Sequence, residues 1–277
     1  MAKDAPCIHD QAPLISAKDR DLGEALPAEF GERYEVHSYR NAARILAAAS
    51  PADFSELIDT LMEFTIDTQE MVEGGRNKSK IALKMDDLLL PKGWYETRIR
   101  GDMLIETTTA EPNPKYGVIK SASKTIRECR VFRINNIIDG HKIDFVKNRV
   151  AFDMEWNSKD QTFDRDLYAM RTFYEAGLID AGVLLTRDTS LSPLFAEIGR
   201  RVEIRDFKSK YGASTTWMGK LTYRLDAGRG GGCPILAIGI KPPVVADFER
   251  WKERHPVIKK GVDAADLVAG DDEEAEE

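Results

Sequence analysis

A short acidic segment carries the residues that could do chemistry. In VAFDMEWN, residues 150–157, apolar side chains alternate with Ala151, Asp153, Glu155 and Asn157. Successive side chains of a strand point to opposite faces, so one face should enter the core while the other carries the two carboxylates. Carboxylate oxygens are hard ligands that select Mg2+ or Mn2+. This pattern predicts a metal site, and its alternative is the solvated acidic face of an exposed strand.

A hairpin can bring a third carboxylate to the same face. Asp144 precedes VKNR, residues 146–149, which supplies a turn. If the first and last residues of VKNR pair, Asp144 lies opposite Ala151, on the face of Asp153 and Glu155. Same-face neighbours on a strand are about 6 to 7 Å apart, close enough to share one cation. Without a cation, the three like charges would repel and raise one another's pKa.

The elements that must position these residues follow from hydrophobic periodicity. The spacing predicts helices over 38–49, 53–73, about 77–89, 160–177 and 192–202. It predicts strands after Trp94, at 129–134, 142–146, 149–156, 182–187 and 234–240, with an exposed loop at 107–117. Helices that alternate with and flank strands predict an α/β or α+β fold with a central mixed sheet.

Length and composition favour one domain with polar ends. The chain has 277 residues, 42% of them hydrophobic, and a formal charge of -7 to which the C-terminal GDDEEAEE contributes strongly. We expect a polar leader at 1–30, one catalytic and DNA-binding domain at 31–262, and a disordered acidic tail at 263–277. Within the domain, 38–90 is the helical part and 90–245 the nuclease core. The sequence contains neither a signal peptide nor a long apolar run, which predicts a cytoplasmic protein without a membrane partner.

The acidic segment and its surroundings resemble a known family. HKIDFVKNRVAFDMEWNSKD at 141–160, followed by FDRDL and GVLLTR, is similar to the catalytic core of BglII-type type II restriction endonucleases, which are related to BamHI. The family pattern has an acidic residue in an IDF-like strand, eight intervening residues, a carboxylate, one residue, and Glu or Gln. It is a variant of the PD-(D/E)XK nuclease motif. Asp144, Asp153 and Glu155 match it, and the resemblance implies the restriction-endonuclease fold.

The resemblance also implies roles for these side chains. Asp144 would bridge one or two Mg2+ ions per active site, for which Mn2+ can substitute, and Asp153 would bind the first. Asp153 replaces the more usual Glu, and Glu155 stands where the general motif has Lys, as in the BamHI branch. Glu155 is therefore the candidate that holds the attacking water, with Lys159 as an outside alternative.

An upstream residue completes the metal site in these relatives. PKGWYETRI at 91–99 is similar to that segment, which nominates Glu96 as a catalytic residue and metal ligand, with Thr97 as the neighbouring alternative. A surface glutamate after a core tryptophan is the competing interpretation.

A later segment, 211–240, is similar to the DNA-contacting region of the BglII branch. Its hydroxyl groups could donate to base edges or phosphates, and its basic side chains could neutralise the backbone. The predicted DNA-binding residues are Asn157, Lys159, Lys210, Ser214, Thr215, Thr216, Lys220, Arg224 and Arg229. The alternative is a hairpin whose Gly-rich turn, 230–232, simply precedes a core strand.

The resemblance implies a type II restriction endonuclease. Such an enzyme makes Mg2+-dependent double-strand cuts at a short, usually palindromic DNA site and leaves 5'-phosphate ends. A palindromic site needs two active sites, so a homodimer is expected, paired through the region of helix 160–177. A DNA methyltransferase in the same cell is the expected companion. The alternatives are a PD-(D/E)XK nuclease of modification-dependent defence or repair, and a noncatalytic DNA-binding protein.

Overall fold

The computed structural model describes residues 18–19, 22, 25–73, 78–110, 126–204 and 207–258. They build a six-stranded mixed sheet in the order β1-β6-β5-β4-β3-β2. Strands β4, β5 and β6 run parallel to one another. β1 pairs antiparallel with β6, β3 pairs antiparallel with β4, and β2 pairs antiparallel with β3. The strands are β1 Tyr34–Tyr39, β2 Tyr95–Ala110, β3 Ile126–Lys147, β4 Val150–Glu155, β5 Ala181–Arg187 and β6 Ile235–Ile240.

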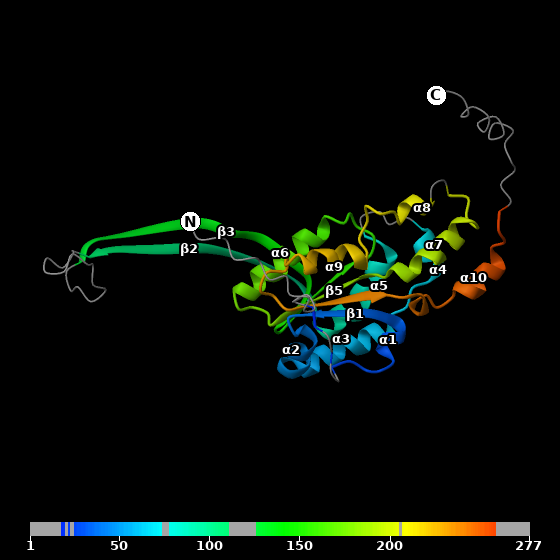
Figure 1. Cartoon of the computed structure of the whole chain (residues 1–277), viewed down its shortest axis with the longest axis horizontal. Helices are drawn as coiled ribbons and strands as arrows, with labels where there is room; N and C mark the ends of the chain where they lie inside the picture. Colours follow the sequence, from blue (N-terminus) through cyan, green and yellow to red (C-terminus); the bar gives the residue numbers. More distant parts are fainter. Residues whose placement is uncertain are drawn as a thin grey trace, which may run out of the picture.

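Helices cover both faces of the sheet (Figure 1). One face packs against α2 Ala42–Ala49, α3 Pro51–Glu63, α5 Lys80–Leu89, α7 Ser192–Gly199 and α10 Phe248–Arg254. The other face packs against α6 Thr162–Glu175 and α9 Met218–Asp226. The shorter helices are α1 Phe30–Arg33, α4 Thr68–Val72 and α8 Phe207–Lys210. The predicted class, a mixed sheet flanked by helices, is confirmed.

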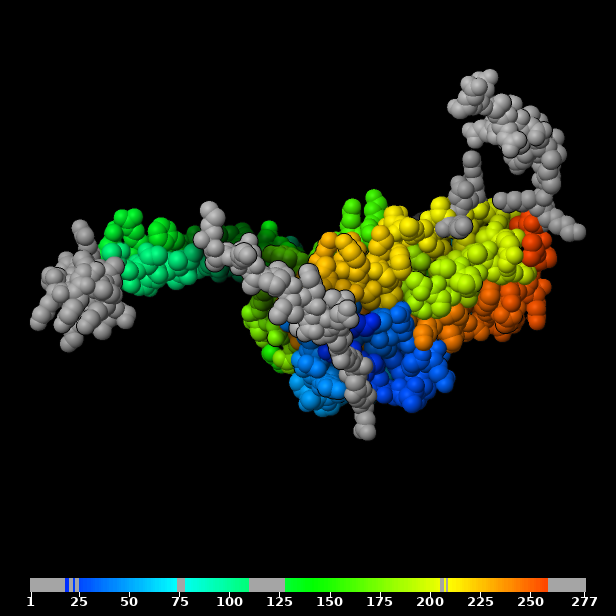
Figure 2. Space-filling view, viewed as in Figure 1, coloured from blue at the N-terminus to red at the C-terminus, as the bar shows by residue number. Residues whose placement is uncertain are grey.

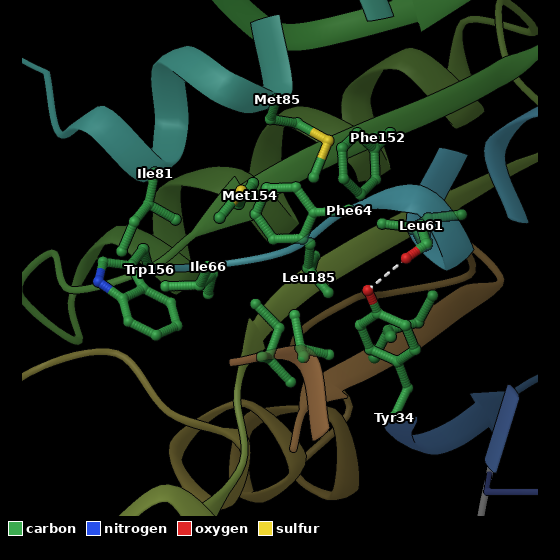
Figure 3. Close-up of a cluster of buried hydrophobic side chains, with 14 of the residues drawn as sticks. Tyr34, Leu61, Phe64, Ile66, Ile81, Met85, Phe152, Met154, Trp156 and Leu185 are labelled. Atoms are coloured by element: carbon green, nitrogen blue, oxygen red, sulfur yellow. Dashed lines mark hydrogen bonds between the residues drawn. The ribbon is translucent and has the colours of Figure 1, made fainter. Parts of the chain in front are cut away.

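The larger core fixes the strand that carries the acidic segment. Phe152, Met154 and Trp156 of β4 and its extension pack with Phe64 and Leu185 in this core (Figure 3). Each large buried side chain contributes roughly 1.5 to 3 kcal/mol of stability. The opposite side of β4 is also covered, since Ala151 packs in the second core with α6. The predicted alternation is therefore confirmed, but the polar face lies beneath a helix.

Strands β2 and β3 extend far beyond the body of the molecule (Figures 1 and 2). We call their outer part, residues 102–110 and 126–137, the arm. Its apolar side chains remain exposed: Met103, Leu104, Ile105, Val131, Phe132, Ile134 and Ile137. The strands expected at 129–134 and 142–146 are thus one continuous strand. The predicted loop begins later than expected, because 107–110 belong to β2, and its remainder lies outside the described residues.

Two helix predictions near the N-terminus need correction. The helix expected at 38–49 begins only at Ala42, since Arg40 and Asn41 take positive φ values of 57° and 61°. The preceding YEVHSY is strand β1, which pairs antiparallel with β6. The helix expected at 53–73 is divided into α3 and α4, because Ile66 leaves the helical path and bridges Val245. Periodicity alone did not reveal these tertiary pairings.

The register of the β3–β4 hairpin also differs from the prediction. Lys147 pairs with Val150 and Val146 with Ala151, instead of Val146 with Arg149. Asp144 consequently lies beside Asp153 rather than Ala151. The slip amounts to two positions on one strand, which preserves the face that each side chain occupies.

Candidate active site

Two carboxylates stand at the C-terminal end of β4. Asp153 is 4% exposed and Glu155 is 7% exposed. Their strand is held on one side by β5, where Leu184 and Thr186 are their register partners. The Thr186 hydroxyl donates to the Glu155 carbonyl at 2.8 Å, which fixes this end of the strand. The two acids are therefore held in a rigid part of the sheet, as a catalytic group requires.

Asp144 reaches the same place from β3. Its backbone N–H donates to Asp153 Oδ1 at 3.0 Å. Its side chain and that of Glu155 line one pocket of about 430 Å3. The predicted triad of Asp144, Asp153 and Glu155 is thus gathered at one end of the hairpin.

A fourth carboxylate, Asp166 of α6, was not among the predicted site residues. It is 2% exposed, and its Oδ2 is buried without a hydrogen-bond partner. Burial, followed by the negative charge of Glu155, raises the pKa of Asp166 to about 8. The available signal was its position in FDRDL, where it falls on the buried stripe three residues after Phe163.

The surroundings of Asp153 are strongly electronegative. Its burial raises the pKa of Asp153 well above its usual range, and the charges of Asp166, Asp144 and Glu155 raise it further. The hydrogen bond from the Asp144 N–H acts in the opposite direction. A buried cluster of this kind favours any cation that can enter it.

Arg165 is the cation that reaches the cluster. Its Nη2 lies 3.3 Å from Glu155 Oε1 and 2.9 Å from Asp166 Oδ1, and its Nε donates to the same Asp166 oxygen at 3.0 Å. The Arg165 side chain is 68% exposed. It can therefore move away without disturbing the core.

The donor chemistry fits a hard divalent cation, since all four side chains supply carboxylate oxygens and one oxygen is buried without a partner. In the part of the chain that the structure describes, however, no three His, Cys, Asp or Glu side chains are grouped to hold a metal ion as they stand. Metal binding therefore requires the acidic side chains to converge by rotation and Arg165 to release Glu155.

The upstream wall of the pocket differs from the prediction. Glu70 and Glu73 near α4, with Lys78 and Ser79 before α5, line the pocket of Asp144 and Glu155. Glu96 instead lies exposed on β2, where its carboxylate accepts a hydrogen bond from Lys142 at 2.6 Å. The neighbouring Thr97 hydroxyl donates to the Tyr95 carbonyl. A bulge between Tyr95 and Thr97 alters the strand at this point.

Several predicted DNA-binding residues border the same end of the sheet. Asn157 lines the pocket and donates to the Lys210 carbonyl, while its Oδ1 is buried without a partner. Lys159 forms an isolated bridge with Thr215. Thr216 is wholly buried and its hydroxyl has no hydrogen-bond partner, whereas Ser214 is exposed.

The predicted basic residues are largely engaged within the protein. Lys210 donates to the carbonyls of Met71, Val72 and Glu73 at the end of α4. Lys220 and Arg224 approach Asp160 at 3.4 and 3.7 Å. Arg224 and Arg229 both pair with Asp164, at 3.1 and 2.5 Å. The segment forms helix α9 and not the hairpin considered as an alternative.

Comparison with known protein families identifies the family of the chain. No curated protein matches the chain. The sequence model of the family "Restriction endonuclease BglII/BglIII" matches residues 34–240. That range spans β1 to β6 and includes all four clustered carboxylates. Members of such families are site-specific deoxyribonucleases that generally use a divalent metal. Among the described residues, no helix is long and apolar enough to cross a membrane. The chain belongs to the BglII/BglIII family of restriction endonucleases.

Proposed function

We propose that the protein is a type II restriction endonuclease that makes Mg2+-dependent double-strand cuts at a short palindromic site and leaves 5'-phosphate ends. The observation that supports this most strongly is that Asp144 and Glu155 line one pocket, while the almost wholly buried Asp153 accepts a hydrogen bond from the Asp144 backbone N–H. Acidic side chains that are buried without enough counter-charge lower the stability of a fold. Their presence here therefore favours a role in binding a cation or in transferring a proton.

Each acid has a distinct part in the proposed chemistry. Asp144 and Asp153 would hold Mg2+, and Glu155 would orient the attacking water and accept its proton. When bound, Mg2+ stabilises the negative charge that develops on the phosphate oxygens. Lys78, at the pocket wall, pairs with Asp86 and is 43% exposed, so it can turn toward the phosphate. Glu96 could contribute only after its pair with Lys142 breaks.

The proposed assembly is a homodimer on double-stranded DNA, accompanied by a methyltransferase in the cytoplasm of the same cell. Two-fold symmetry of the protein matches the two-fold symmetry of a palindrome. The outer surface of α6 and α9 offers exposed Tyr168 and Tyr223 for such pairing. Aromatic side chains of this kind are enriched in subunit interfaces.

Cleavage of unmethylated phage DNA tests the proposal. We expect discrete fragments with Mg2+ and intact DNA with a chelator, and sequencing of the ends should reveal one short palindrome. Modified DNA that is cut while unmodified DNA stays intact would indicate modification-dependent defence. DNA that is bound but never cut would indicate a noncatalytic protein.

The variant Asp144→Asn examines the metal site directly. It removes one negative ligand at a partly buried position, so cutting should fall by at least about a hundredfold, since metal-assisted charge stabilisation is worth several kcal/mol. Binding in a gel-shift assay without metal should remain close to that of the wild type. An Asp144→Asn protein that cuts at the normal rate would contradict the assignment.

A further inference from the structure

Arg187, at the C-terminal end of β5, is a buried cation that lacks an acidic partner in the part of the chain that the structure describes. Its side chain is 4% exposed and packs its guanidinium carbon over the rings of Phe195 and Tyr211, at 5.6 and 5.5 Å from their centroids. No acidic side chain among the described residues forms an ion pair with it. The adjacent Asp188 directs its oxygens to Thr189 and Ser190 instead.

The hydrogen bonds of Arg187 are incomplete. Its Nη2 donates to the Tyr211 carbonyl at 3.3 Å and to the Thr215 hydroxyl. Its Nε is buried with no hydrogen-bond partner. Burial lowers the pKa of Arg187 to about 10, which still leaves the guanidinium charged near neutral pH. A buried cation with an unused donor is unfavourable until an anion meets it.

Arg187 faces a pocket that suits an anion. The pocket has a volume of about 190 Å3, and none of the described residues that line it is acidic. Ser192 supplies a hydroxyl group to the lining, which also includes Gly212 and Ala213. Trp217, also in the lining, is the N-cap of α9 and gives that helix no side-chain cap. The free N–H groups of a helix start add positive potential nearby.

The pocket is next to the acidic site. Tyr211 lines both pockets and separates them. Arg187 directly follows Thr186, which is the register partner of Glu155 on the adjacent strand. Because Glu155 and Arg187 both lie at the C-terminal ends of adjacent parallel strands, the two pockets lie at the same end of the sheet. An extended polyanion that enters the acidic pocket can therefore continue into the basic one.

We propose that the Arg187 pocket binds a backbone phosphate of the DNA, adjacent to the phosphate that is cut. This inference rests on the proposed nuclease function. Arg187 contributes a forked pair of donors, and the Ser192 hydroxyl completes the phosphate contacts. The contact fixes the register of the strand relative to Asp144, Asp153 and Glu155. It carries no sequence information by itself.

The test compares the salt dependence of DNA binding for three full-length proteins: wild type, Arg187→Gln and Arg201→Gln. The probe is a duplex carrying the mapped cleavage site, measured by fluorescence anisotropy with a chelator present. Losing one phosphate contact should lower the slope of log Kd against log salt by about 1 and weaken binding roughly tenfold or more. The Arg201 side chain is also mostly buried, but it forms an ion pair with Glu197. The Arg201→Gln variant should therefore keep the wild-type slope.

A second variant covers the case in which Arg187→Gln does not fold. Arg187→Lys keeps the charge but loses the forked donors, so it should bind more weakly with a nearly unchanged slope. Neutral methylphosphonates placed one at a time in the duplex then locate the contact. One position next to the cut should weaken wild-type binding and have a smaller effect on the Arg187 variant.

The outcomes separate the possible failures. A wild type that binds and cuts DNA, with Arg187→Gln keeping the wild-type slope, would overturn the phosphate pocket alone. A methylphosphonate profile identical in wild type and variant would do the same. Inorganic phosphate that raises the melting temperature through Arg187, with DNA binding unaffected by the substitution, would assign the pocket to a free anion. A wild type that neither binds nor cuts DNA would overturn both proposals.

Discussion

Asp153 and Asp166 show how a functional site departs from ordinary core packing. Burial raises the pKa of both side chains, the charge of Asp166 raises that of Asp153 further, and the charge of Glu155 raises that of Asp166 further. Arg165 balances only part of this charge, since its guanidinium contacts Glu155 and Asp166 from a largely exposed position. Arg165 thus supplies part of the positive charge that the proposed divalent cation would bring to the cluster.

Substitution of Arg165 tests this balance. We expect Arg165→Gln to lower the melting temperature of the metal-free protein, because the acids lose their counter-charge. Added Mg2+ should then raise the melting temperature more in the variant than in the wild type. Differential scanning fluorimetry measures both effects. Arg171→Gln is the matched control on α6, since the ion pair that Arg171 forms within the described part of the chain is with exposed Glu175. An equal Mg2+ response in all three proteins would contradict a competition between Arg165 and the metal.

At the scale of elements, the ends of short helices shape the site. Lys210 donates to Met71, Val72 and Glu73 at 2.9, 3.3 and 2.6 Å, which joins α8 to the C-terminal end of α4. The Tyr211 hydroxyl donates to the Met71 carbonyl as well. These contacts close the wall that Glu70 and Glu73 contribute to the acidic pocket.

We expect Lys210→Met to destabilise the protein by about 1 to 3 kcal/mol. The substitution removes the charged group that donates to three carbonyl oxygens at the end of α4. Urea denaturation followed by tryptophan fluorescence gives this free energy of unfolding. Lys80→Met is the control, because Lys80 is 63% exposed and its one ion pair among the described residues is with Glu73. Exposed pairs contribute about 0 to 1 kcal/mol. Comparable losses for both variants would show that the α4 contacts matter little.

The features of the site that depend on local sequence were predicted better than those that depend on tertiary packing. Period-two alternation located Asp153 and Glu155, because the pattern of a strand between two cores is visible within a few residues. Asp166 was missed, because its burial arises only when α6 packs on the sheet. The prediction for Glu96 depended on its distance from Trp94 along the chain. That distance gives no information about the bulge in β2.

The arm offers a chemical test of strand register. Cys129 Sγ lies 3.4 Å from Glu106 Oε1 across the β2–β3 ladder, and this carboxylate raises the pKa of the exposed thiol. Glu106→Gln should lower that pKa and thereby increase the thiolate fraction at pH 8. Iodoacetamide should then alkylate Cys129 faster, as followed by peptide mass spectrometry. Buried Cys233, whose pKa burial raises to about 12, should stay slow in both proteins. An unchanged Cys129 rate would argue against this pairing.

At the scale of the whole molecule, the arm and the body differ in what holds them together. The body has two hydrophobic cores on opposite faces of one sheet. In the arm, the described side chains of residues 102–109 and 128–137 are exposed. A two-stranded ribbon is at best marginally stable by itself, because it buries too little apolar surface to offset its loss of chain entropy. The arm therefore depends on the body, while the body has little need of the arm.

This asymmetry predicts the result of removing the arm. Gly101 and Ile138 are register partners, so residues 102–137 can be replaced by an Asn-Gly turn that closes the shortened hairpin. The strand segment with Asp144 stays in place. We expect cooperative unfolding to persist and the melting temperature to change by less than about 4 °C, the shift that about 1 kcal/mol produces in a domain of this size. Scanning calorimetry of the two proteins decides the matter: a much larger drop, or loss of the cooperative transition, would mean that the arm is part of the folding unit.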